Sequence, residues 1–92
     1  MSQTETFAAH PEVVACELEG GAALLDLRTS TYFSLNTVGS VLWQALQSPG
    51  SVDSLVAIVA DRFDTTAEHC RADVETYLKQ LQSRQLVTIV QG

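Results

Sequence analysis

The change from strand to helix falls within residues 31–43, which read Thr31-Tyr32-Phe33-Ser34-Leu35-Asn36-Thr37-Val38-Gly39-Ser40-Val41-Leu42-Trp43. The first residues of this stretch, 31–35, have the aromatic and β-branched content of a strand. Asn36 is a favoured N-cap residue, and after it the apolar residues recur at helical spacing. The stretch therefore predicts a strand that passes directly into a helix over about residues 37–47.

The residues before this stretch predict two more strands. Residues 13–18 are rich in β-branched residues and end at Glu19-Gly20-Gly21, where the glycines suit the positive φ of a tight hairpin turn. Residues 22–27 run back as a second strand, and the polar turn 28–30 leads into the strand at 31–35. Three strands joined by short turns form an antiparallel meander.

The residues after the stretch predict two more helices. Ser48-Pro49-Gly50 ends the first helix, and Ser51 can cap a second helix that ends near Phe63. Thr66 can cap a longer third helix that runs to about Arg84. The inner faces of these two helices are marked by apolar residues at helical spacing: Val52, Leu55, Val56, Val59 and Phe63, then Cys70, Val74, Tyr77, Leu78 and Leu81.

The order of these elements predicts an α+β fold, a three-stranded antiparallel sheet followed by three helices that pack on one face of the sheet. A chain of 92 residues can build one core only. We expect residues 1–11 to form a flexible N-terminal tail and residues 12–92 to form the domain. The apolar residues 86–90 predict one further short strand.

Charge and composition exclude several classes of partner. Five Lys or Arg against eleven Asp or Glu give a net charge of -6, the wrong sign for binding nucleic acid. The same charge repels anionic membranes and favours a partner with Lys or Arg at its docking surface. There is no apolar stretch of about 18 residues, and residues 1–10 lack the basic and apolar regions of a secretory signal. We therefore expect a soluble, cytoplasmic protein.

No arrangement of residues predicts catalysis, a metal or a cofactor. His69 and Cys70 are neighbours on a helix, so their side chains point in different directions and cannot form a base and nucleophile pair. The acidic residues between 61 and 75 lack the dense ligand pattern of a calcium loop, which indicates a solvated face. Cys16 and Cys70 are too far apart for a C-x-x-C motif, and we expect both thiols to be reduced and buried.

The strand at 31–35 leaves one edge of the predicted sheet open. Consecutive strands usually pair in order, so this strand keeps a row of unpaired N–H and C=O groups. It has no Lys, no Pro and no inward charge to protect that edge. Two interpretations stay open: the tail strand 86–90 covers the edge, or an extended peptide adds to it through main-chain hydrogen bonds.

Several short motifs occur in a distinctive order: Leu24-Leu25-Asp26-Leu27, Tyr32-Phe33-Ser34-Leu35-Asn36 with Gly39, Val41-Leu42-Trp43, Val52-Asp53-Ser54-Leu55, Asp73-Val74 with Leu78 and Leu81, and Leu86-Val87. Together they cover about residues 13–90. Their order resembles the PqqD-like family, whose members recognise the leader peptides of ribosomally made, modified peptides.

The resemblance implies a winged helix-turn-helix-like domain that has no catalysis of its own. Such a domain binds a leader peptide as an added strand against its third strand, beside its third helix. Carried onto this sequence, the peptide-binding residues would be Thr31, Tyr32, Phe33, Ser34 and Leu35 on the strand and Asp73, Val74, Tyr77, Leu78 and Leu81 on the helix. A plain core role is the alternative for Leu35 and the apolar helix residues, and Trp43 is interpreted as core.

The chain looks most like the stand-alone leader-binding proteins of lasso-peptide pathways, which deliver a precursor to a separate cysteine protease alongside an ATP-dependent cyclase. One alternative is a peptide chaperone for a radical enzyme in pyrroloquinoline quinone biosynthesis, and another is a purely structural subunit. A DNA-binding winged helix is the competing class, but the basic residues on the third helix are offset by acidic ones: Arg71, Lys79 and Arg84 against Glu68, Asp73 and Glu75.

Overall fold

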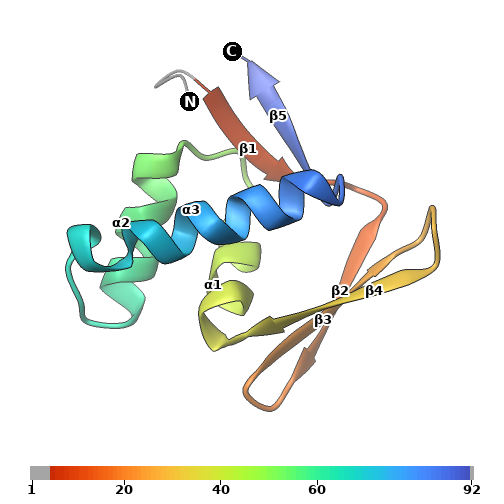
Figure 1. Ribbon diagram of the computed structural model, residues 1–92, viewed down its shortest axis with the longest axis horizontal. Helices are drawn as coiled ribbons and strands as arrows, with labels where there is room; N and C mark the ends of the chain where they lie inside the picture. The colour runs from red at the N-terminus through yellow and green to blue at the C-terminus, as the bar shows by residue number, and fades with distance from the viewer. Residues whose placement is uncertain (1–4, 92) are drawn as a thin grey trace.

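The computed structural model describes residues 5–91 and has two antiparallel sheets with three helices packed against them (Figure 1). The larger sheet has the strand order β2-β3-β4, with β2 at Val13–Leu18, β3 at Gly21–Asp26 and β4 at Thr31–Asn36. The helices are α1 at Thr37–Ala45, α2 at Val52–Arg62 and α3 at Ala67–Ser83. The predicted α+β fold, with a three-stranded antiparallel sheet followed by three helices, is confirmed.

Each helix begins where the sequence places a capping side chain. Asn36, Ser51 and Thr66 each accept a hydrogen bond from the backbone N–H three residues later, at 2.9, 3.2 and 3.1 Å. These bonds satisfy N–H groups that have no partner within the first turn of a helix. None of the three helices in residues 5–91 combines the length and apolarity of a membrane span.

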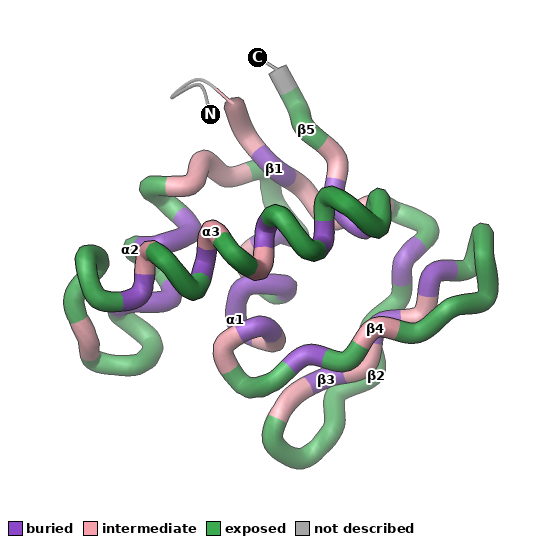
Figure 2. The backbone as a smooth tube through the Cα atoms, in the orientation of Figure 1, coloured by how far each residue is buried: buried purple, intermediate pink, exposed green. Residues whose placement is uncertain are grey.

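The core lies between the larger sheet and the helices (Figure 2). Alternate residues of β3 face it, and Leu24 in the middle of that strand is fully buried. Leu42 of α1 and Leu78 of α3 are also fully buried, and each such side chain contributes roughly 1.5–3 kcal/mol of burial free energy. Trp43 lies in the same core, as the sequence predicts.

Residues 5–9 form a strand, which corrects the expectation of a flexible tail over residues 1–11. This strand, β1 at Glu5–Ala9, pairs antiparallel with β5 at Val87–Gln91. Phe7 is its one fully buried side chain, and the Phe7 N–H donates to the Gly50 carbonyl at 2.8 Å. The local pattern could not reveal β1, because its partner strand lies at the other end of the chain. Residues 1–4 and 92 lie outside the described residues.

The two cysteines differ in burial. Cys70 on α3 is buried as predicted, and its thiol donates to the Val56 carbonyl with a sulfur-to-oxygen distance of 3.6 Å. Cys16 is exposed, so the expectation that both thiols are buried is wrong for this residue. On β2 alternate side chains point away from the helices, and Cys16 falls on that outer face.

Candidate functional site

The edge of β4 that faces away from β3 has no strand partner among residues 5–91. β4 pairs with β3 along its whole length, whereas β5 pairs with β1 in a separate sheet. The interpretation in which the tail strand covers this edge is therefore wrong. An unpaired edge presents a row of N–H and C=O groups to which another strand can pair.

Two open hollows lie between β4 and α3, one near each end of the strand, and the space that they mark is named here the β4–α3 groove. The first, named here the Arg84 hollow, has about 230 Å³ and is lined by Asp26, Thr29, Thr31, Tyr32, Phe33, Arg84 and Leu86. The second, the Tyr77 hollow, has about 260 Å³ and is lined by Asn36, Val38, Asp73, Thr76, Tyr77 and Gln80. Small-molecule sites usually have roughly 300–1,000 Å³, so each hollow is better matched to a side chain of an extended peptide.

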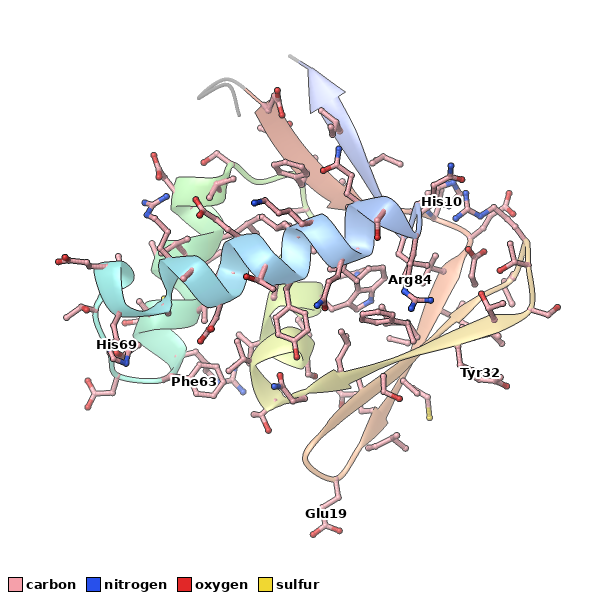
Figure 3. All side chains as sticks on the ribbon, viewed as in Figure 1. His10, Glu19, Tyr32, Phe63, His69 and Arg84 are labelled. Atoms are coloured by element: carbon pink, nitrogen blue, oxygen red, sulfur yellow. The ribbon has the colours of Figure 1, made fainter. Side chains whose placement is uncertain are left out.

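The Arg84 hollow has an aromatic floor under a cation. The guanidinium carbon of Arg84 lies 5.0 Å from the centroid of the Phe33 ring, within the range of a cation–π interaction. Figure 3 shows Arg84 directed from the end of α3 toward β4. This contact joins the two walls of the groove at one end.

An ion pair fixes the spacing of the walls at the same end. Arg28 donates two hydrogen bonds to the carboxylate of Asp26, at 3.0 and 2.9 Å, and a third to the carbonyl of Gln85, at 2.6 Å. Asp26 is only 3% exposed, and its hydrogen bond from Arg28 lowers the pKa of its carboxyl. The ion pair holds Arg28 in place, and because Gln85 directly follows Arg84, the hydrogen bond from Arg28 to Gln85 ties the β3–β4 turn to the end of α3.

The wall of the Tyr77 hollow depends on a glycine. A Cβ atom at Gly39 would lie 2.9 Å from Cζ of Tyr77, closer than real Cβ contacts come, and 3.0 Å from Cδ2 of Leu35, which is a tight contact. Glycine therefore lets the Tyr77 ring of α3 pack directly on the first turn of α1. This packing places the ring beside the end of β4.

The residues that the resemblance implied fall into three groups. Four of them line the hollows: Thr31, Phe33, Asp73 and Tyr77. Four others belong to the core, with almost no surface free for a peptide: Leu35, Val74, Leu78 and Leu81. Ser34 is exposed, and Tyr32 borders the Arg84 hollow but is 70% exposed and points to the outer face of the sheet (Figure 3).

Sequence reasoning missed Gln80 and Arg84 as groove residues. Asp73, Tyr77, Gln80 and Arg84 recur at i, i+4, i+7 and i+11, which places them on one face of a helix. That polar stripe beside the apolar one was the available signal. No such pattern indicated that Asp26 and Arg28 hold the site together, because their role depends on the contact of Arg28 with Gln85, far along the chain.

One protein family matches most of the chain. The family model described as coenzyme PQQ synthesis protein D (PqqD) matches residues 21–87, which is most of the chain. The chain belongs to the PqqD family. The part of this PqqD-family chain that matches contains β3, β4 and all three helices, and so both walls of the groove.

Two solved structures are similar to this PqqD-family chain. One is TbiB1 in complex with the TbiA(beta) leader peptide, with 25% identity and a TM-score of 0.74, covering 87% of this chain and 93% of the other. The second is a lasso peptide synthetase B1 complexed with the leader peptide, with 20% identity and a TM-score of 0.72, covering 89% of this chain and 96% of the other. No curated protein matches the chain significantly.

Proposed function

We propose that this chain binds the leader region of a ribosomally made precursor peptide as an added strand on β4, in lasso-peptide biosynthesis. The observation that carries the proposal is the open edge of β4, which faces α3 across a groove with a hollow at each end. Both similar solved structures are complexes with leader peptides, which supports the same class of ligand here.

The groove can supply enough free energy for this role. Four or five added backbone hydrogen bonds contribute about 0.5–1.5 kcal/mol net each. Two side chains buried in the hollows contribute roughly 1.5–3 kcal/mol each. After the cost of ordering the peptide, the balance corresponds to a dissociation constant of about 1 μM or somewhat lower.

The proposed role is non-catalytic, so a partner does the chemistry. Residues 5–91 hold no group of three or more His, Cys, Asp or Glu that could bind a metal. His69 is exposed while the neighbouring Cys70 is buried in the core, so the two do not form a reactive pair. The chain would deliver the bound precursor to a separate cysteine protease, which works alongside a cyclase.

A titration with the leader peptide of a precursor encoded near the gene tests the proposal. Backbone amide shifts recorded by NMR should be largest at residues 31–36 and at the groove residues of α3, and binding should saturate. The β2 residues 13–18 serve as the internal control. Shifts centred on β2, or no saturable binding, would contradict strand addition on β4.

The family description favours one second candidate, a peptide chaperone in the synthesis of pyrroloquinoline quinone. In that role the same groove would present its peptide to a radical enzyme. The two candidates differ in their peptide, so a direct competition between a lasso leader and a pyrroloquinoline quinone precursor separates them. We expect the lasso leader to bind more tightly.

A further inference from the structure

Two side chains of opposite charge stand at opposite ends of the β4–α3 groove. Arg84 lies over Phe33 in the Arg84 hollow, and Asp73 lines the Tyr77 hollow. Among residues 5–91, neither side chain makes an ion pair or a hydrogen bond. The groove therefore has a cationic end and an anionic end, and both charges are available to a ligand.

Among residues 5–91, no other basic side chain both lines a hollow of the groove and is free of an ion pair. Arg28 is held by Asp26 at 2.9 Å, and Arg71 by Asp53 at 2.7 Å. Arg62 and Lys79 have no ion pair within the described residues, but neither lines a hollow of the groove. In a chain with a net charge of -6, Arg84 is thus the groove's own free cation. Its planar guanidinium is suited to binding a carboxylate.

The distance between the two charges sets a spacing in the ligand. Positions 73 and 84 are about 16 Å apart along α3, from a rise of about 1.5 Å per residue. An extended peptide advances about 3.4 Å per residue, and its side chains face the same side at every second position. Four residues span about 14 Å and six about 20 Å, so a separation of four residues fits best.

The direction of β4 sets the order of the charges. β4 begins at Thr31, beside the Arg84 hollow, and ends at Asn36, beside the Tyr77 hollow. The strands of this sheet all pair antiparallel, which is also the slightly more stable arrangement per residue. An antiparallel peptide would run from Asp73 toward Arg84, with its N-terminal part at the anionic end.

The geometry points to a charge register in the peptide, an inference that rests on the proposed strand addition. The groove selects an extended segment with a Lys or Arg that meets Asp73 and, four residues toward the C-terminus, an Asp or Glu that meets Arg84. Apolar residues between and beside them fill the hollows. Reversal of either charge should weaken binding about tenfold, because like charges are brought together.

A display library of random 12-residue peptides, selected on the full chain, tests the register whatever the sequence of the leader. The wild-type protein should enrich a basic residue followed four positions later by an acidic one. R84E should change the second preference to basic, and D73K should change the first preference to acidic. K79E is the matched control on the same helix and should select the same peptides as the wild type.

Affinities of the best selected peptide complete the test. R84E should bind it about tenfold more weakly, and reversing the acidic residue of the peptide should restore the affinity. R84Q, which removes the charge without reversing it, should give a smaller loss. Arg84 and Asp73 are both exposed, so the thermal midpoints of the variants should stay near that of the wild type.

The outcomes separate this inference from the proposed function. Selected peptides that shift residues 31–36 in NMR spectra but show no charge register would overturn the inference and leave peptide binding in place. A register in the opposite order would overturn the antiparallel direction. If neither the library nor the leader gives a saturable ligand, the proposed function itself fails.

Discussion

The two outer strands of the larger sheet, β2 and β4, are alike in length but differ in what lies beside them. Each has six residues and pairs with β3 on one side only, within residues 5–91. Two hollows border β2, with about 530 and 240 Å³, and α1 forms the opposite wall of each. β2 also has a charged residue, Glu17, whose carboxylate accepts a hydrogen bond from Gln44 of α1 at 2.7 Å.

Charge favours β4 as the proposed binding edge, although the largest of these hollows lies beside β2. A charge on an edge strand protects it against pairing, and β4 has none between Thr31 and Asn36. The hollows of β4 lie against α3, where Arg84 contacts Phe33 of the strand itself, whereas Arg62 lines a hollow at the far end of β2, beside Leu18. The family match begins at residue 21, so it contains β4 and α3 but leaves out β2.

The greatest change is expected in stability, when β1, the strand that pairs with β5 away from β4, loses its buried anchor. Phe7→Ala should lower the free energy of unfolding by about 3–5 kcal/mol, because Phe7 is fully buried and anchors β1 beside β5. Urea unfolding followed by circular dichroism measures the loss. Val90→Ala on β5, where the side chain is 39% exposed, is the control and should cost less than about 1 kcal/mol. Equal losses would show that β1 is not anchored in this way.

A smaller change, in leader affinity, is expected when either of the two tyrosines near β4 is replaced by alanine. Tyr77→Ala should weaken leader binding by about tenfold, or about 1.4 kcal/mol, because the ring forms a wall of a groove hollow. Tyr32→Ala should change the affinity less than about threefold, since its ring lies on the outer face of the sheet. Isothermal titration calorimetry gives the affinities, and thermal melts give the midpoints. A greater loss for Tyr32→Ala would move the site to the outer face.

The smallest effect is expected at the β2 edge. Glu17→Ala removes the hydrogen bond to Gln44, yet both residues are exposed, so stability should change by no more than about 0.5 kcal/mol. Leader affinity should stay equal to that of the wild type in the same titration. A clear change in affinity in either direction would show that the β2 edge takes part in binding, and the contrast between the two edges would fail.

The helices could be predicted closely because their signals are local. The helix caps accept hydrogen bonds from the backbone N–H three residues later, so a short stretch of sequence is enough to predict them: Asn36, Ser51 and Thr66. The same holds for the alternation of β3 and β4, which fixes the face of Phe33. The site was predicted less well, because apolar helix residues such as Val74 can serve a core or a groove, and periodicity does not separate the two.

Local patterns in the chain were enough to predict the α+β order of elements, the helix caps, and a strand at 31–35 without protecting charges. Two features became clear only in the folded protein: β5 pairs with β1 and so leaves β4 open, and Arg84 meets Phe33 across the groove. The two sets of interactions differ in range. Caps and periodic patterns act within a few residues, whereas strand pairing and the walls of a groove join segments that are far apart in the chain.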